Sequence, residues 1–480
     1  MIAIGLNHGG THEVQTVVQV FFPGQGIRIC AQGETPSQGF FVKSTVDERF
    51  AHGHVYRDGL LISEHSIPLT NLPVYLNKKR VVMLALYHAL QAAVGAYTPW
   101  GALTGIRPSR MVRELMDAGF ASEKIIHVLA EPFCVTEPKA RLALQVAHNE
   151  RRVTEAIFAG GGHPVGIYLG LPFCPTRCVY CSFNMAHRAA RPEEMAAYVH
   201  VLKQECHEKA QQLAQMGGRV SSIYIGGGTP TALPDALLAD VLAIVAQEFG
   251  AAPEFTVEAG RPDTITQANL DIMKAAGVTR IAINPQTLND KTLKFIGRGH
   301  DAADFFRAFS MARAAGFNLI NTDIIVGLPG ETATDIRRTM EALATVAPEN
   351  ITVHTLAVKR ASLLIENITD YPLPTAQATE EMLAIAAEET QKMGQAPYYL
   401  YRQKNMVGMF ENVGYARLGQ ECSYNVGMMA ETQTVLGMGA GAVSKFVTGD
   451  KISREFNHKN PEHYVRTVRG LADHTSTRFS

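Results

Sequence analysis

Hydrophobic and polar positions follow one repeating pattern through the middle of the chain. Short apolar runs alternate there with longer amphipathic segments. The pattern predicts strands at Val165–Leu171, Ser221–Ile225, Glu254–Glu258, Thr279–Asn284, Leu319–Val326 and Asn350–Leu356. It predicts helices at Glu193–Ala214, Asp235–Glu248, Ile265–Ala276, Ala302–Ala315 and Thr332–Ala347. Because strands that alternate with helices form parallel sheets, we expect an α/β fold with a closed or partly closed barrel.

Both ends of the chain lack this alternation. The first part mixes strand-like runs at Val14–Phe22 and Leu60–Ile67 with helical stretches at Lys79–Val94 and Ser122–Ala130. The run Ala159–Pro164 is rich in glycine, which disfavours helix and strand, so we predict a linker there. We therefore expect an N-terminal α+β domain of unknown role (1–160), a barrel (161–360) and a C-terminal α+β module that covers the barrel mouth (361–480).

Composition places the chain among globular proteins. Apolar residues make up 46% and charged residues 19%, which is enough for a hydrophobic core. The formal net charge is −1 and the basic residues are scattered, so we expect no nucleic-acid partner. No window reaches about 18 uninterrupted apolar residues, and the start lacks a secretory leader pattern. We expect a cytoplasmic protein without a membrane span.

Three of the 7 cysteines crowd together directly after the first barrel strand. Cys174, Cys178 and Cys181 have CxxxCxxC spacing, which favours metal binding over disulfides. Three thiolates can hold three irons of a [4Fe-4S] cluster and leave the fourth iron open. A structural zinc site is the alternative, but it needs a fourth ligand, for which His187 is the local choice. We expect the other cysteines to be small buried hydrophobic residues: Cys30, Cys134, Cys206 and Cys422.

Polar and glycine-rich positions fall near the ends of successive strands. Gly226–Pro230 follows the second strand, and consecutive glycines let a backbone approach a ligand closely. Glu258 ends the third strand, Gln286 follows the fourth and Arg298 comes 12 residues later, while Asp323 lies inside the fifth. A hydrophobic core cannot satisfy all of these groups, so we expect them to converge on one polar ligand. Taken singly, Arg298 could be a surface charge and Asp323 a cap or ion-pair partner.

The segment Tyr168–Cys181 resembles the cluster loop of radical S-adenosylmethionine (SAM) enzymes. In that family SAM binds the open iron, and one electron from the cluster cleaves SAM to methionine and a 5′-deoxyadenosyl radical. The resemblance implies that the cysteine triad holds one [4Fe-4S] cluster and that Tyr168 orients SAM, although a core aromatic is the alternative for Tyr168. It assigns further SAM contacts to Tyr180, Gly227, Gly228 and Thr229.

A second resemblance concerns Glu258, Gln286, Arg298 and Asp323. Together they resemble the SAM contacts of the oxygen-independent coproporphyrinogen III oxidase group, in which the Glu serves the cluster-bound SAM and the other three line a second SAM site. One or two SAM molecules are therefore implied. The segments that look like the HemZ-type branch of this group are Leu103–Pro108, Glu258–Asp263 and Val353–Leu356.

Membership of this group implies a partial (β/α)6 radical SAM barrel and a tetrapyrrole partner, either a porphyrinogen or a haem. The radical would take hydrogen from the β-carbon of a propionate, and loss of CO2 and one electron would leave a vinyl group. Two such steps convert coproporphyrinogen III to protoporphyrinogen IX. We expect flavodoxin or a ferredoxin as electron donor and a monomeric enzyme. Arg402 and Lys404 are candidates for pairing propionates.

Two departures from the oxidase pattern leave alternatives open. Characterised oxidases carry a further Cys where Phe183 stands, and the related haem chaperones have Phe-Asn at that place. The chaperones also carry a His-Asn pair, proposed to hold haem iron, and Tyr424 stands in place of that histidine. Tyr424 could bind haem, but a packed ring is the commoner role. A haem chaperone and a radical SAM methyltransferase acting on haem therefore stay as alternatives.

Overall fold

A computed structural model describes residues 1–96, 98–105, 107–182, 190–359, 362–366, 371–403, 406–449 and 451–468. Phe183, His187 and Lys404 lie outside these ranges, so their predicted roles stay predictions. The chain divides into two compact units, one with residues 1–148 and 400–411 and one with the remainder. The first unit thus includes a short stretch from the C-terminal part of the chain, and the three-domain division with borders at 160 and 360 stays a prediction.

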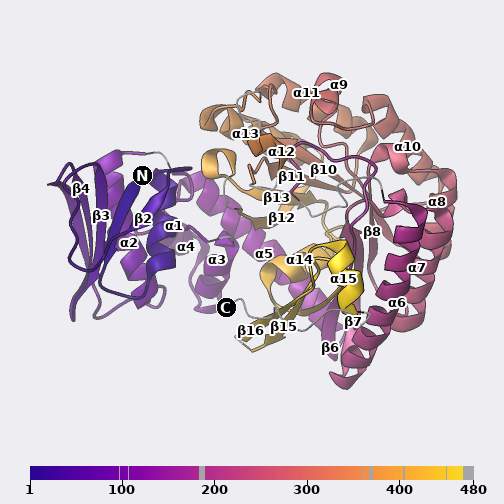
Figure 1. Cartoon of the computed structure of the whole chain (residues 1–480), viewed down its shortest axis with the longest axis horizontal. Helices are drawn as coiled ribbons and strands as arrows, with labels where there is room; N and C mark the ends of the chain where they lie inside the picture. Colours follow the sequence, from indigo (N-terminus) through magenta and orange to yellow (C-terminus); the bar gives the residue numbers. More distant parts are fainter. Residues whose placement is uncertain are drawn as a thin grey trace. The chain divides into compact units, whose positions relative to one another are not determined.

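The first unit contains a five-stranded sheet in the order β2-β1-β3-β4-β5, with helices beside it (Figure 1). Its strands are β1 (Ile2–Leu6), β2 (Ile27–Ile29), β3 (Phe40–Val46), β4 (Phe50–Arg57) and β5 (Leu60–Pro68). Its helices are α1 (Thr11–Phe21), α2 (Lys78–Val94), α3 (Pro108–Asp117) and α4 (Ser122–Ala130), and α5 (Glu137–Ala159) runs from this unit into the second. The strand predicted at Leu60–Ile67 and the helices predicted at Lys79–Val94 and Ser122–Ala130 are confirmed.

The strand predicted at Val14–Phe22 is wrong, because this segment is helix α1. Its valines favour strands locally. However, Val14, Val17, Val18 and Phe21 recur at helical spacing, and all are buried. Burial of this one face stabilises the helix and outweighs the local strand preference.

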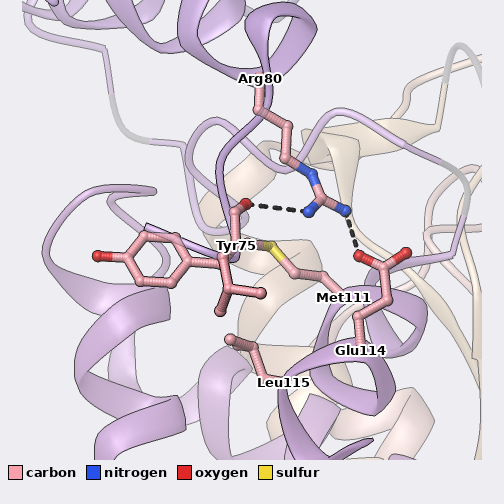
Figure 2. Close-up of a pocket in the computed structure, with 6 residues that line it drawn as sticks. Tyr75, Arg80, Met111, Glu114 and Leu115 are labelled. Carbon is pink, nitrogen blue, oxygen red and sulfur yellow. Dashed lines mark hydrogen bonds and ion pairs between the residues drawn. The ribbon is translucent and has the colours of Figure 1, made fainter. Parts of the chain in front are cut away.

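Figure 2 shows a small pocket in the first unit, lined by residues from α2, α3 and the segment before α2. Arg80 donates to the carbonyl of Tyr75 at 3.0 Å and to a carboxylate oxygen of Glu114 at 2.5 Å. These two contacts occupy the guanidinium, so it joins the neighbouring segments rather than facing the pocket as a free charge. We assign the pocket no chemistry.

The second unit is built on one 11-stranded sheet in the order β12-β13-β11-β10-β9-β8-β7-β6-β14-β15-β16. Its barrel strands are β6 (His163–Leu171), β7 (Gly218–Gly227), β8 (Phe255–Gly260), β9 (Arg280–Ile283), β10 (Ile320–Val326) and β11 (Asn350–Thr355). All neighbouring pairs among these six are parallel, which confirms the predicted strand-helix alternation. The C-terminal strands are β12 (Ala396–Tyr401), β13 (Asn412–Ala416), β14 (Thr434–Met438), β15 (Val443–Thr448) and β16 (Lys451–Phe456).

Helices of the second unit cover the outer side of this curved sheet, as α6, α7, α8 and α10 show in Figure 1. The helices described in the second unit are α6 (Pro192–Gln215), α7 (Asp235–Phe249), α8 (Gln267–Ala275), α9 (Asp290–Phe295), α10 (Ala302–Ala314), α11 (Ala333–Val346), α12 (Leu363–Glu366), α13 (Ala376–Lys392), α14 (Ser423–Ala430) and α15 (Pro461–Val468). Short 3-10 turns occur at Pro230–Ala232, Pro262–Thr264 and Val407–Met409. No helix within the described ranges is both long and apolar enough to cross a membrane.

The sheet ends at β12 on one side and β16 on the other, so within the described part the barrel is partial and not closed. The strands described after residue 360 join this sheet and do not form one of their own. Strand β14 pairs in parallel with β6, and β13 pairs antiparallel with β11, so they extend the barrel sheet at both edges. The carboxyl ends of the six parallel strands lie along one edge, which is where a barrel places its functional groups.

Candidate functional site

The cysteine-bearing loop leaves the sheet at the end of β6, and its backbone is tied to three other elements. The amide of Thr229 donates to the carbonyl of Phe173 at 2.7 Å. The amide of Val179 donates to the carbonyl of Ile296 at 3.0 Å, and the Val179 carbonyl accepts from Leu364 at 2.9 Å. Segments after β7, after α9 and within α12 therefore hold this loop in place.

The three loop cysteines form no disulfide; Cys178 is buried, while Cys174 and Cys181 are half-buried. Across the described ranges, no three His, Cys, Asp or Glu side chains gather where a single metal ion could bind. A zinc site needs such a gathering. In a [4Fe-4S] cluster each thiolate binds a different iron, so the sulfurs need not converge on one point. The loop geometry is therefore compatible with a cluster.

Of the isolated cysteines, Cys206 and Cys422 are buried as expected. Cys30 and Cys134 are only half-buried, so the expectation of full burial was wrong for them. Both lie in the first unit, in turns that follow β2 and α4. Short connections of this kind leave one side of a small side chain open to solvent.

A buried arginine fixes the cysteine loop to the end of β8. Arg261 is 1% exposed, and its Nε and Nη2 hold the two carboxylate oxygens of Asp263 at 3.0 and 2.9 Å. Its Nη1 donates to Thr176 Oγ1 at 2.5 Å. His300 Nδ1 lies 3.6 Å from Asp263 Oδ1. Although burial alone raises it, the pKa of Asp263 is held well below its usual value by His300 and Arg261, so this carboxylate stays ionised and anchors the loop.

The glycine run after β7 lies against the same loop. Gly227 has a φ of +98°, a backbone conformation that residues with a side chain rarely adopt. A Cβ at Gly228 would lie 2.4 Å from the carbonyl oxygen of Phe173, so only glycine fits there. Thr229 Oγ1 lies 3.0 Å from Cys174 Sγ. The structure thus explains these glycines by the close approach of their backbone to the cysteine loop. Contact of these residues with SAM stays a prediction.

Among the carboxyl groups near these strand ends, Glu258 has the pKa that lies furthest from its ordinary value. It accepts hydrogen bonds from the Tyr224 hydroxyl and the Gly227 amide, and Asn284 Nδ2 lies 3.4 Å from its Oε1. Burial raises the pKa of Glu258 to about 8, and the negative charge of Asp323 adds to this rise. A buried carboxyl group that changes charge near neutral pH, with donors around it, is typical of a ligand site.

Gln286 has two features that point to a ligand. Its φ of +71° is unusual for a residue with a side chain. The amide of Gln286 donates to the Asp323 carbonyl at 3.0 Å and its carbonyl accepts from Ile325 at 2.8 Å, so β10 holds this backbone in place. Within the described part of the chain, Gln286 Oε1 is buried without a hydrogen-bond partner. An acceptor buried without a hydrogen bond costs free energy, and a ligand that donates a hydrogen bond to Gln286 Oε1 would remove this cost.

Arg298 faces the cysteine loop. Its Nη2 donates to the carbonyl of Asn284 at 3.2 Å, and its Nε is buried without a partner among the described residues. Although burial alone lowers it, the pKa of Arg298 is raised by Tyr180 and by Cys178. Asn284 Oδ1 also accepts from the amide of Asp323 at 3.2 Å, so one buried amide side chain links β8, β9 and β10.

Asp323 lies inside β10, and its Oδ2 is 3.3 Å from His354 Nε2 on β11. Both side chains are about a quarter exposed, at 22% and 25%. Its charge raises the pKa of Glu258, which places the two carboxyl groups close to each other. The structure therefore brings Glu258, Arg298 and Asp323 into one region, as the sequence predicted, and their proposed contact with SAM stays a prediction.

Tyr168 lies in a group of three stacked rings. Its ring centroid is 6.4 Å from that of Tyr224 and 6.2 Å from that of Tyr424. The latter two are 4.7 Å apart, at an interplanar angle of 25°. Burial raises the pKa of Tyr168, and Glu258 adds to this. Tyr180 is likewise raised in pKa by burial.

Sequence reasoning missed the parts of the site that depend on packing between distant segments. Tyr224 lies two residues before the glycine run and reads as an ordinary strand aromatic. Asn284 directly follows β9 and has no motif around it. The position of both at the carboxyl ends of predicted strands was the one sequence feature that could have indicated them.

The proposed propionate partner Arg402 is occupied elsewhere. It lies in the first unit and is 8% exposed, with Nη2 donating to the Met409 carbonyl at 2.9 Å and Nη1 donating to the Leu103 carbonyl. These contacts do not favour a role in binding a carboxylate.

In the second unit, Lys359 follows β11 and is half-buried. No described residue pairs with its ammonium group, and burial lowers its pKa while nearby Cys181 acts in the opposite direction.

Taken together, these residues fit a [4Fe-4S] cluster with SAM. The loop supplies three cysteines and has its backbone fixed at several points. Gln286 Oε1 and Arg298 Nε are buried polar atoms without partners in the described ranges, and Glu258 is a carboxyl group poised near neutral pH. A polar ligand with both donor and acceptor groups satisfies all three.

Comparison with known proteins agrees with this assignment. Residues 168–343 match the family model described as Radical SAM superfamily. The chain is 35% identical to the oxygen-independent coproporphyrinogen-III oxidase-like protein HemZ of Bacillus subtilis, over 96% of this chain and 94% of that protein. It is 29% identical to the heme chaperone HemW of the same organism, over 63% of this chain and 75% of that protein.

Among solved structures, the fold is similar to that of the coproporphyrinogen III oxidase HemN from Escherichia coli, a radical SAM enzyme. The TM-score is 0.51 at 24% identity, and the match covers 68% of this chain and 72% of that one. At this level the likeness concerns the fold alone, and it agrees with the partial barrel described above.

Proposed function

Because the chain belongs to the radical SAM superfamily, in the HemZ branch of the oxygen-independent coproporphyrinogen III oxidase group, we propose that it converts coproporphyrinogen III to protoporphyrinogen IX. The superfamily uses a [4Fe-4S] cluster and SAM. When bound, they supply a 5′-deoxyadenosyl radical that takes a hydrogen atom from the substrate. Cys174, Cys178 and Cys181 would hold the cluster.

The remaining roles fall to side chains at the strand ends. Glu258, with the Gly227 amide beside it, would bind the SAM on the cluster. Gln286, Arg298 and Asp323 would contact either this SAM or a second SAM next to it. Tyr168, Tyr180, Gly228 and Thr229 complete the proposed SAM contacts. The protein's task is to hold the porphyrinogen against the SAM ribose and to exclude water and oxygen, because the difficult chemistry belongs to the cofactor.

One observation favours this function over haem binding. Tyr424 stands where the related chaperones carry a histidine, and it is only 5% exposed and stacked on Tyr224. A side chain packed in this way is poorly placed to reach a haem iron. Full-length similarity to HemZ, compared with partial similarity to HemW, supports the same choice.

Lys359 is our candidate for a substrate carboxylate. The Leu364 amide donates to the carbonyl of Val179, so the start of α12, shortly after Lys359 in the chain, lies against the cysteine loop. Ser362 donates to the Lys359 carbonyl at 2.9 Å through its amide and at 2.6 Å through its hydroxyl, which ties Lys359 to the start of α12. A half-buried ammonium group at that place suits a propionate.

The haem chaperone is the second candidate, favoured by the HemW similarity and by the Phe-Asn pair after the cysteine triad. A methyltransferase acting on haem shares the same barrel. For the oxidase, a low-potential donor such as flavodoxin or ferredoxin, a cytoplasmic location and a monomeric state complete the proposal. They rest on the need to keep the cluster reduced, and we propose no nucleic-acid partner.

The test is an anaerobic turnover experiment. The protein is reconstituted with iron and sulfide, supplied with reductant, SAM and coproporphyrinogen III, and the products are followed by mass spectrometry. Protoporphyrinogen formed together with 5′-deoxyadenosine, and lost in Cys178→Ala, would support the oxidase. Tight haem binding with slow SAM cleavage not coupled to porphyrinogen would instead indicate the chaperone.

A further inference from the structure

Helix α14 enters the second unit through a buried ionic anchor. Glu254, just before β8, accepts from the amides of Ser423 and Tyr424 at 2.9 and 3.0 Å and from Cys422 Sγ at 3.2 Å. Arg280 lies 3.6 Å from the same carboxylate. Glu254 and Arg280 are 7% and 2% exposed. An acidic side chain at a helix start satisfies amides that the helix itself cannot, so the first turn of α14 is fixed to the barrel.

Arg280 holds the approach to this helix as well. Its Nη2 donates to the carbonyls of Gln420 and Glu421 at 3.1 and 3.0 Å, and its Nη1 donates to Asn321 Oδ1 at 2.8 Å. A buried charge with several acceptors permits little movement, because any shift leaves part of it unpaired. The chain before α14 is therefore held at the start of β9 and β10.

The anchor delivers one ring to the barrel interior. Tyr424, the second residue of α14, is 5% exposed and stacks on Tyr224 with a centroid distance of 4.7 Å. Offset aromatic pairs at such distances are favourable beyond the area they bury. Tyr224 in turn donates its hydroxyl to Glu258. A C-terminal helix thus contacts, through one intermediate ring, the carboxyl group proposed to bind SAM.

Tyr224 has little freedom except on the side that Tyr424 covers. A Cβ at Gly226 would lie 2.7 Å from Glu258 Oε2 and 2.8 Å from the Tyr224 ring, so these two side chains already fill the space above Gly226. The centroid of the Tyr168 ring lies 6.4 Å from that of Tyr224, at an interplanar angle of 21°. Removal of the Tyr424 ring would let Tyr224 tilt and would break its hydrogen bond to Glu258.

We propose that Tyr424 is a positioning residue for SAM binding. By stacking on Tyr224 it keeps the Tyr224 hydroxyl on Glu258, and this bond orients the carboxyl group toward SAM. The proposal rests on the proposed function only in taking Glu258 as a SAM contact. By this proposal the C-terminal segment contributes to the SAM site through the aromatic ring of Tyr424 and not through the Tyr424 hydroxyl.

The experiment measures SAM affinity of the reconstituted, reduced protein by the change in the EPR spectrum of the cluster, with no tetrapyrrole present. We expect Tyr224→Phe and Tyr424→Leu each to weaken SAM binding about tenfold, the size of one lost hydrogen bond to a charged group. Tyr424→Phe keeps the ring and should retain the affinity. The double variant Tyr224→Phe/Tyr424→Leu should bind no more weakly than either single one, because Tyr424 acts through Tyr224.

Phe305→Leu provides the matched control, since it removes a fully buried ring from α10, on the outer side of the barrel. It should lower the melting temperature and leave SAM affinity unchanged. If Tyr424→Leu behaves like this control, or if its effect adds to that of Tyr224→Phe, the proposal is wrong. Equal loss in Tyr424→Phe would assign the effect to the hydroxyl and would also overturn it.

Two further measurements keep the outcome decisive. Should Tyr424→Leu fail to incorporate the cluster, Tyr424→Met replaces it, because methionine fills irregular core space without a ring. The pH profile of SAM binding in Tyr224→Phe must shift upward, since the lost hydrogen bond lowers the pKa of Glu258 in the parent protein. Wild-type SAM binding without porphyrinogen turnover would refute the oxidase function alone and leave this proposal standing.

Discussion

Replacement of Thr229 by valine tests whether its hydroxyl tunes the cluster. Thr229 is 2% exposed, and its Oγ1 lies 3.0 Å from Cys174 Sγ. A cysteine bound to iron is a thiolate, so the hydroxyl must donate, and hydrogen bonds to sulfur help to set cluster potentials. A hydrogen bond contributes about 0.5–1.5 kcal/mol to a neutral group and about 1.5–3 kcal/mol to a charged one. Reduction adds negative charge to the cluster, so the hydrogen bond stabilises the reduced cluster more than the oxidised one. A difference of about 1 kcal/mol between these two stabilisations corresponds to about 40 mV for one electron.

We therefore expect T229V to lower the midpoint potential by about 40 mV, because the reduced cluster loses more than the oxidised one. T229S keeps the hydroxyl and should retain most of the potential. The measurement is an anaerobic redox titration followed by EPR, without SAM, so that a change in SAM contact does not contribute. Iron content is the control for cluster loading. A fully loaded valine variant with the parent potential, or an equal shift in the serine variant, would refute the reasoning.

Four further outcomes follow from the same structure. Tyr464→Phe removes a 2.6 Å hydrogen bond to Glu205 and should cost about 2 kcal/mol of stability. Burial raises the pKa of Glu205, so stability falls as pH rises above the usual carboxyl range, and melting scans of this variant should show a steeper fall. Lys359→Met should raise KM for coproporphyrinogen III about tenfold while Lys359→Arg does not. SAM affinity should rise as pH passes the Glu258 pKa of about 8, because the ionised form is the better acceptor, and a profile unchanged in Glu258→Gln would contradict this. Cys178→Ser should lose bound iron and visible absorbance.

The barrel was predictable because its elements are set by local patterns. Each predicted strand from Val165–Leu171 to Asn350–Leu356 overlaps a strand of the structure, since short apolar runs between amphipathic helices have few other ways to bury themselves. Helix α1 escaped the same reasoning because its β-branched residues favour strands locally, and only the packing of one face decides between the two.

The site was predictable as far as its residues share a motif or a strand end. Cys174 lies in a motif and Glu258 near a strand end, which is how the sequence indicates them, and their roles stay predictions. The contacts of Tyr224 and Asn284 with Glu258 could not be predicted, because each depends on a neighbour from a different strand that sequence distance does not reveal. Buried hydrogen bonds between distant segments follow from the three-dimensional register of the sheet, and no local pattern records that register.

The described strands of the C-terminal segment are part of the barrel sheet of the second unit. A module that only covered the barrel mouth could be removed while the strands beneath it kept their pairing. Here β14 forms a parallel pair with β6, the strand that leads into the cysteine loop, and α14 is bound by Glu254 and Arg280. The edge of β6 is completed by residues more than 250 positions later in the chain, so the strand that leads into the cysteine loop is paired on both sides only when the C-terminal segment has joined the sheet.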